Sequence, residues 1–221
     1  MKNRVLLLAS MFSISPLSAI ALEMTSLFLQ GDNDLHGGYA VARETAHVAA
    51  YDGAQVRSYD NTVIRAFDTC QCESFDQSIV HAHAQVKVKA YDNSRVIASN
   101  NSDVDAVGNV NIQATDKAII VAHGNCTVFA ADRVTVRAYD HVSVFVAGHA
   151  KVEAHDKAIV LARESSTVEA GDDVEVKGYG DTKVHATGKC VIDANDNCDV
   201  TASPAVVVEK HDDAQVTRTK I

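Results

Sequence analysis

Large side chains are scarce in this sequence. Tryptophan is absent, aromatic residues make up 5% of the 221 residues, and there are only two prolines. Apolar residues nevertheless reach 47%, mostly as Ala and Val. A compact globule normally fills its core with large side chains, so this composition argues against one. It predicts a thin core of small residues, and a repeat is therefore the first pattern to look for.

An excess of positive charge is also lacking. The formal net charge is −9 at neutral pH. Binding to nucleic acid selects for basic patches, so the charge argues against a nucleic-acid partner. It is compatible with solubility and with cation binding.

The first residues differ from the rest of the chain. Lys2 and Arg4 give a short basic start, an apolar stretch runs from Val5 to Leu17, and Ala19-Ile20-Ala21 is an A-x-A cleavage pattern. Together these features predict a secretory signal peptide cut after Ala21. The protein is therefore expected to be secreted, periplasmic or on the cell surface.

A membrane anchor is the alternative for the same segment. A spanning helix needs about 20 consecutive apolar residues. Ser10, Ser13, Ser15 and Pro16 interrupt this stretch too early. No other stretch is long and apolar enough, so no membrane span is expected after cleavage.

An eight-residue repeat fills most of the chain. From Ala40 to Gln215 the sequence divides into 22 octads without insertion or deletion, of which Val48-Ala-Ala-Tyr-Asp-Gly-Ala-Gln55 is typical. Numbering each octad from one to eight, position one is Val or Ile in 20 octads, and position three is Ala in 17. Position five is Asp in 12 octads and Gly in five. Nothing follows the 3.6-residue period of a helix.

The octad predicts one short strand and one tight corner. Side chains alternate between the two faces of a strand, so positions seven, one and three share a face and carry a small–Val–small triplet. Positions four to six, often Tyr-Asp-Asn or Tyr-Asp-Gly, have the composition of turns. Short strands joined by identical corners wind into an all-β, single-chain parallel β-solenoid. The constant period leaves no protruding loops, which commonly carry active sites.

The outward positions eight and two indicate how many strands form one coil. If a coil holds 16 residues, one face carries ten apolar residues at 22 outward sites and the other face only two. Sorting for a 24-residue coil separates the residues less sharply. We therefore expect two strands per coil and about 11 coils, or about 53 Å at roughly 4.8 Å per coil.

The partly apolar face is the candidate association surface. Exposed apolar patches larger than a few hundred Å² usually mark interfaces. We expect a homo-oligomer or another protein partner there, and the alternative is that residues 22–39 fold over part of the face. The predicted interface residues are Val63, Ile79, Ile97, Phe129, Phe145, Ile159, Leu161, Val191 and Val207.

Both ends of the array carry features that argue against an open filament. Residues 1–21 are the predicted signal peptide, 22–39 an N-terminal cap or linker, 40–216 the solenoid, and 217–221 a C-terminal tail. Lys210 places a charge where Ala belongs, Pro204 occupies a corner, and Arg218 follows. Such residues block strand edges that would otherwise pair with another chain.

Few residues suggest chemistry. Four cysteines fall at position seven and one at position one, so all are expected to be buried thiols: Cys70, Cys72, Cys126, Cys190 and Cys198. The nine histidines of the array all lie at outward positions. Zinc or copper ligation by His123 and His155 is conceivable in a 16-residue coil, but no carboxylate–histidine spacing supports it. No metal site, catalytic pair or phosphate-binding loop is predicted.

The aspartates at position five form two columns at the corners. Stacked carboxylates repel unless calcium or hydrogen bonds satisfy them. The preferred interpretation is that each Asp accepts hydrogen bonds from turn amides in its own corner. The occurrence of Gly at the same position fits this interpretation better than calcium binding, because Gly readily adopts an unusual φ but has no side chain to bind a metal ion. Bound calcium is the alternative.

Aromatic residues at position four form columns beside these aspartates. At the spacing of one coil such rings stack on each other, or they form a platform for sugar rings. The candidate ligand-binding residues are Tyr51, Tyr59, Phe67, Phe75 and Tyr91.

The octads resemble those of bacterial octapeptide-repeat β-solenoids (parallel β-helices). Ala90-Tyr-Asp-Asn-Ser-Arg-Val96 and Ala138-Tyr-Asp-His-Val-Ser-Val144 carry the resemblance, which covers about four-fifths of the chain. It implies architecture alone, because solenoids host unrelated functions.

The sequence thus predicts a secreted, non-catalytic structural or interaction protein without a cofactor. A glycan- or calcium-binding module is the second hypothesis. An ice-binding protein is disfavoured, because solenoids of that kind resemble flat Thr arrays and here charges occupy the outward positions. A polysaccharide-active enzyme is disfavoured, because such solenoids resemble longer, irregular coils with loops.

Overall fold

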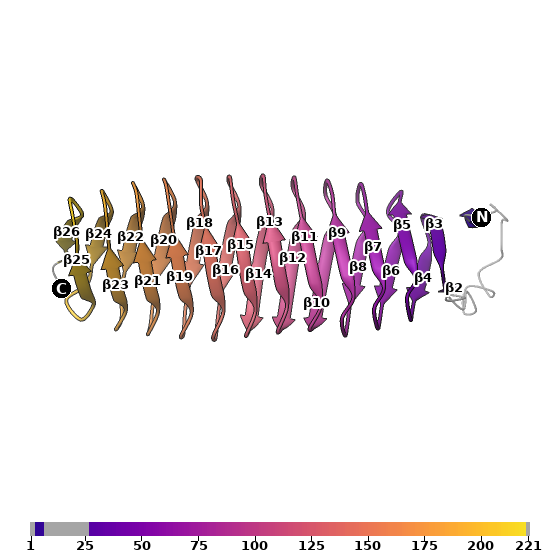
Figure 1. Cartoon of the computed structure of the whole chain (residues 1–221), viewed down its shortest axis with the longest axis horizontal. Coiled ribbons are helices and arrows are strands. Elements are labelled where there is room, and N and C mark those ends of the chain that lie inside the picture. The colour runs from indigo at the N-terminus through magenta and orange to yellow at the C-terminus, as the bar shows by residue number, and fades with distance from the viewer. Residues whose placement is uncertain (1–2, 7–26, 220–221) are drawn as a thin grey trace, which may run out of the picture.

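Short strands stack along one axis throughout the described part of the chain. The computed structural model describes residues 3–6 and 27–219. Figure 1 shows the strands side by side along the long axis, with the two ends of the chain at opposite ends of the stack. Successive strands belong alternately to two parallel sheets of 13 strands each, so each coil contributes one strand to either sheet.

The odd-numbered strands form the first sheet, here called sheet A. They are β1 (Asn3–Leu6), β3 (Asp32–His36), β5 (His47–Tyr51), β7 (Val63–Ala66), β9 (Ile79–Ala82), β11 (Arg95–Ala98), β13 (Asn111–Ala114), β15 (Thr127–Ala130), β17 (Ser143–Val146), β19 (Ile159–Ala162), β21 (Glu175–Gly178), β23 (Val191–Ala194) and β25 (Val207–Lys210).

The even-numbered strands form the second sheet, here called sheet B. They are β2 (Leu27–Leu29), β4 (Tyr39–Ala42), β6 (Gln55–Ser58), β8 (Gln71–Ser74), β10 (Lys87–Asp92), β12 (Asp103–Gly108), β14 (Ile119–Gly124), β16 (Thr135–Ala138), β18 (Lys151–Ala154), β20 (Thr167–Ala170), β22 (Lys183–Ala186), β24 (Asp199–Ala202) and β26 (Gln215–Arg218).

The strand register confirms the predicted coil. Val48 of β5 lies opposite Ile64 of β7, and Ala50 lies opposite Ala66, sixteen residues later in each case. The same octad position therefore recurs along each column of a sheet. Parallel strands need a crossover connection, and the opposite strand with its two corners supplies it. There are about 12 coils rather than 11, because β2 and β3 continue the sheets before the first octad.

The core is the small–Val–small triplet that the octad predicts. Position-one residues such as Val80 and Val96 are fully buried, as are Ala82 and Ala98 at position three. Position three faces position seven across the core. At Gly178 of position three, a Cβ atom would lie 2.8 Å from Cys198 Sγ of position seven. These small residues allow the two sheets to pack closely.

Buried hydroxyl groups close the corners from inside. At position seven, Ser78 Oγ donates to the Phe75 carbonyl oxygen at 2.6 Å, and Ser94 Oγ donates to the Tyr91 carbonyl oxygen at 2.7 Å. Every serine at position seven, and Thr182, has a partner three residues earlier in its own turn, which offsets the cost of burying it. The buried hydroxyl groups of Thr62 and Ser74 have no such partner.

Each corner turns through a left-handed residue at position five. Sixteen non-glycine residues and five glycines at this position have φ between 53° and 110°, and Pro204 is the exception. The left-handed region is unfavourable for most side chains, and Gly, Asn and Asp enter it most readily. This requirement explains why Asp and Gly dominate position five.

The N-terminal part continues the sheets. β2 pairs with β4, and Leu29 is buried whereas Phe28 is exposed. Most of the predicted signal peptide lies outside the described residues, apart from β1, which pairs with β3. No helix in the described residues is long and apolar enough to span a membrane.

Candidate association surface

The nine predicted interface residues all lie on the outer face of sheet A, at positions eight and two of its strands. Five of them are exposed, from 38% for Phe145 to 61% for Val207. The other four, Val63, Ile79, Ile97 and Leu161, are half-buried. Residues 27–39 extend the two sheets and form strands β2 to β4, so this described part of the predicted cap is not a cover over the face.

Two stacked phenylalanines form the centre of this face. Phe129 of β15 and Phe145 of β17 lie with ring centroids 4.9 Å apart and ring planes 12° from parallel. Beside them the neighbouring corner carries only Ala131 and Ala147, which leaves a shallow apolar groove bordered by Leu161. Large rings next to small corner residues give this region both a ridge and a recess, a shape that suits contact with another apolar surface.

Between β7 and β25, the arginines and the glutamates on the outer face of sheet A are separated along the long axis, and Lys177 of β21 is a cation on the glutamate side. Arg65 and Arg95 lie on the N-terminal side of the phenylalanine pair, and Glu175 and Glu209 lie on the C-terminal side. Within residues 3–6 and 27–219, no oppositely charged group lies within 4.0 Å of Arg65, Arg95 or Glu175. These three charges are left to solvent.

The pKa of His81 is affected by the arginines at the N-terminal end of this face. Burial, followed by the charge of Arg65, lowers the pKa of His81, and Arg95 contributes in the same direction. At the negative end, Lys177 holds the pKa of Asp193 below its usual range through a contact of 2.8 Å. The two arginines thus disfavour a further positive charge on His81, whereas Lys177 favours the negative charge of Asp193.

The outer face of sheet B is organised differently. Its charges alternate between neighbouring strands, so that Lys87 lies opposite Asp103 and Lys89 opposite Asp105. Arg137 Nε lies 2.9 Å from Glu153 Oε2, and Arg57 Nε lies 2.8 Å from Glu73 Oε2. Because cations and anions alternate along it, this face is typical of a surface that remains in water.

The corner aromatics stack on one another. Tyr59, Phe75 and Tyr91 form one column with ring centroids 5.0 and 4.9 Å apart. Tyr51 and Phe67 form another, with centroids 5.0 Å apart. The ring faces are thus largely covered by neighbouring rings, which leaves their edges for a sugar. Glycan binding by these five residues stays a prediction.

The sequence did not reveal how far these columns extend. His36 stacks on Tyr51, and His83 stacks on Phe67. Arg43 caps the other column, with its guanidinium carbon 4.7 Å from the centre of the Tyr59 ring. His36 precedes the first octad, so the repeat alone gave no reason to align it. His123, Tyr139 and His155 form a third stack, in which the tyrosine ring separates the two histidines.

The position-five carboxylates accept hydrogen bonds, but not from their own corner as expected. Asp60 Oδ2 accepts from the Glu44 backbone N–H at 3.0 Å, and Asp156 Oδ2 accepts from the Asp140 N–H at 3.1 Å. The donor is in the preceding coil, because coil stacking brings successive corners one above the other. In the described residues, no three His, Cys, Asp or Glu side chains converge as a metal site. Calcium binding stays a prediction.

All five cysteines are buried free thiols, as predicted. Burial raises the pKa of each, to about 11 for Cys198. Cys126 Sγ donates to the His123 carbonyl oxygen at 3.1 Å and so takes the part that serine takes in other coils. These thiols serve packing and turn closure.

Fold and face together define the protein as a parallel β-solenoid with one partly apolar side and one side on which cations and anions alternate. No family model matches the chain, and no curated protein or solved structure matches it either.

Proposed function

We propose that this chain is a secreted, non-catalytic interaction protein that associates through the outer face of sheet A. The difference between its two faces carries the proposal. Sheet B alternates cations and anions between neighbouring strands, whereas sheet A exposes Phe129, Phe145, Ile159, Val191 and Val207. Phe129, Phe145, Ile159 and Leu161 lie on three neighbouring strands, and an exposed apolar patch of this kind often marks an interaction site.

The rest of the architecture supports a presenting surface. Every octad has the same length, so the repeat adds no loop on either side in which an active site is commonly built. The likeness of the octads to bacterial solenoid repeats, together with the basic–apolar N-terminus, supports an exported bacterial protein. Export is tested by N-terminal sequencing of the secreted chain, which is expected to begin at Leu22.

Light scattering of the protein tests the association surface. Phe129→Lys with Phe145→Lys places two charges at the centre of the apolar face, and Ile119→Lys with Val121→Lys is the matched control on sheet B. We expect a wild-type mass above that of one chain, a monomer for the first variant and no change for the control. A wild type with the mass of one chain would contradict self-association. Circular dichroism establishes that each variant is folded.

A further inference from the structure

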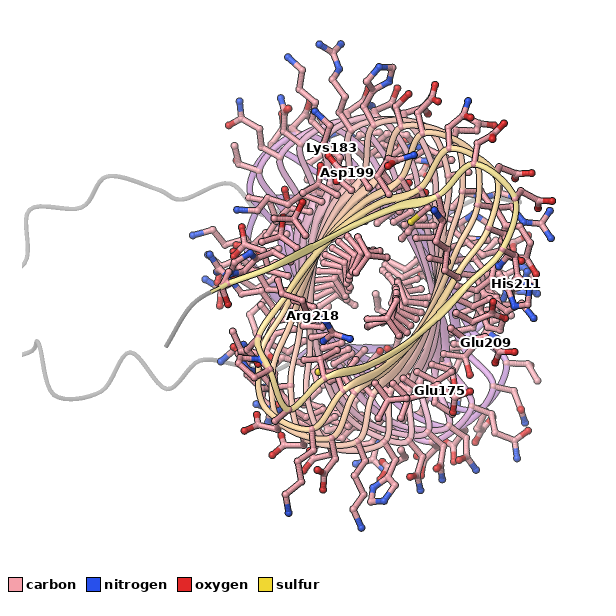
Figure 2. The ribbon with its side chains drawn as sticks, turned by 90° about the vertical axis from the view of Figure 1, so that its left-hand side faces the viewer. Glu175, Lys183, Asp199, Glu209, His211 and Arg218 are labelled. Atoms are coloured by element: carbon pink, nitrogen blue, oxygen red, sulfur yellow. The ribbon has the colours of Figure 1, made fainter. Side chains whose placement is uncertain are left out.

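The charges and apolar side chains on sheet A are arranged so that the face complements itself. Arg65 and Arg95 lie before the phenylalanine pair and Glu209 and Glu175 lie after it, at equal numbers of strands from the pair. Lys177, beside Glu175, is a cation on the C-terminal side, and it is paired with Asp193 within the chain. Arg95 of β11 lies two strands before β15, and Glu175 of β21 lies two strands after β17. Figure 2 shows Glu175 and Glu209 on the same side of the coil, opposite Lys183 and Asp199 of sheet B.

Consider a two-fold axis that lies in the plane of contact, runs parallel to the strands and passes between β15 and β17. It places the outer face of sheet A against the same face of a second copy, whose solenoid axis runs in the opposite direction. Each octad position then faces the same position of the other copy. At position two, Phe129 faces Phe145 of the second copy. Such an isologous contact uses the same patch on both subunits and closes as a dimer.

The same rotation brings opposite charges together along the face. β11 lies across from β21, which places Arg95 against Glu175 at position eight. β7 lies across from β25, which places Arg65 against Glu209.

Apolar residues also meet apolar residues at the outer strands. Val63 faces Val207, and Ile79 of β9 faces Val191 of β23. No facing pair between β7 and β25 joins like charges, and the one charge that faces an apolar residue is Lys177, which lies across from Ile97. Electrostatic complementarity of this kind selects the partner and fixes the register.

From this pattern we infer that the partner of the proposed association face is a second copy of the chain, packed antiparallel with Arg95 against Glu175. The inference rests on the proposed function and specifies its partner. Ten strands cover roughly 48 Å by about 15 Å, or about 700 Å² per copy, close to the approximately 800 Å² per partner of a standard interface. The three charges without intrachain ion pairs then gain partners.

A two-fold axis along the solenoid is less favourable. It would place each coil against the same coil of the second copy and position eight against position two. Arg95 would then face Ile97, and Val191 would face Asp193. That arrangement leaves the arginines without acids, so the antiparallel arrangement is the one that the charges favour.

Charge reversal distinguishes these arrangements. Arg95→Glu and Glu175→Arg each create two like-charge contacts in the antiparallel dimer, because the axis repeats the pair. Residues 95 and 175 lie beside uncharged neighbours in register, namely Ile79, Asn111, Ile159 and Val191, so neither change faces a like charge in register within one chain. Glu175→Arg does add a second cation beside Lys177 on the same strand. Lys183→Glu with Asp199→Lys, which exchanges two opposite charges in register on the opposite face, is the matched control (Figure 2).

The experiment is sedimentation equilibrium of the full-length chain, its two single variants, the double variant and an equimolar mixture of the singles. We expect each single variant to weaken the dimer at least about tenfold. The mixture is expected to form a heterodimer, and the double variant to dimerise as the wild type does, because both restore two opposite-charge contacts. The control is expected to dimerise like the wild type.

Three other outcomes would overturn the inference in different ways. Dimers that survive charge reversal but dissociate with Phe129→Lys and Phe145→Lys would overturn the register and support the association face. Dimers that survive both sets would overturn the register and the proposed function together. A wild type that is monomeric at high concentration would overturn the second copy as the partner.

Discussion

Asp156 accepts a hydrogen bond at 3.1 Å from the backbone N–H of Asp140, the residue at the same corner one coil earlier. Asp156 in turn donates its own N–H to Asp172 at 3.3 Å. Aspartate therefore meets two requirements at once, since it tolerates the left-handed backbone and supplies the acceptor that joins successive corners.

Replacing Asp156 separates these two contributions. Asp156→Ala loses the acceptor and strains the backbone, so we expect a loss of about 1–3 kcal/mol in the free energy of unfolding. Asp156→Gly relieves the strain and is expected to cost less, and Asp156→Asn, which keeps an acceptor, less again. Urea unfolding followed by circular dichroism gives this order. Equal losses for all three variants would contradict the explanation.

The reverse change is available at Ala84, a position-five residue with φ of 70°. Ala84→Asp introduces a residue suited to this backbone and an acceptor for the Asp68 N–H. We expect the free energy of unfolding to rise by about 1 kcal/mol. Ala84→Gly, which relieves only the strain, is the control and is expected to gain less. A loss of stability with Ala84→Asp would count against the carboxylate ladder.

The period, the strand faces and the two-sided coil were predictable from the sequence, because a slip of one residue would bury charges throughout the array. Val48, Ala50 and Ala54 show which face of each strand is inside. Outward apolar residues are frequent on alternate strands, such as the one with Phe129, and rare on the others, such as the one with Val121, and this difference shows which strands share a sheet. The hydrogen-bond donors to Asp60 and Asp156 were not predictable, because they depend on how closely one coil lies above the next. The place of His36 in the aromatic column was not predictable either, because His36 lies outside the regular repeat.

Gly178 shows a compensation that only the packing reveals. A Cβ atom there would lie 2.8 Å from Cys198 Sγ. We expect Gly178→Ala to destabilise the protein by about 1–3 kcal/mol, as overpacking does. With Cys198→Ala present, the same change is expected to become neutral or stabilising, because Ala suits a strand better than Gly. Urea midpoints of the four proteins give the coupling, and additive effects would contradict the contact.

The buried thiols predict a dependence on pH. Burial raises the pKa of Cys70 and the other four cysteines, so thiolates form in the unfolded chain at lower pH than in the folded chain. The contribution to stability is complete below the ordinary thiol pKa of about 8.5 and is lost as pH rises through the folded-state values. We expect the urea concentration at the unfolding midpoint to decrease as the pH is raised from the ordinary thiol pKa to the folded-state pKa values. A chain with all five cysteines replaced by Ala or Ser serves as the control.

Thiol labelling gives an independent measurement of the same burial. We expect negligible reaction with a thiol reagent at neutral pH in the native protein and reaction of all five cysteines in guanidinium chloride. Rapid labelling of any thiol in the folded chain would show that the solenoid opens locally at that coil.

Lys210 and Arg218 close the C-terminal end of the solenoid. Both occupy position three, where the repeat otherwise places a small inward residue. Arg218 Nη1 donates to the Ser203 and Val206 carbonyl oxygens at 3.0 and 2.7 Å, and Figure 2 shows it at the open end of the coil. An uncovered final coil would present strand edges to another chain.

Lys210→Ala with Arg218→Ala is therefore expected to cause end-to-end association. The test is made in the Phe129→Lys, Phe145→Lys background, which suppresses contact through sheet A. We expect the sedimentation coefficient to rise with protein concentration, because final coils of small residues pair through free backbone groups. Arg137→Ala with Lys151→Ala removes two cations from sheet B and is expected to have no such effect. If the mass stayed at one chain across concentrations, the two cations would not be what keeps the end from pairing.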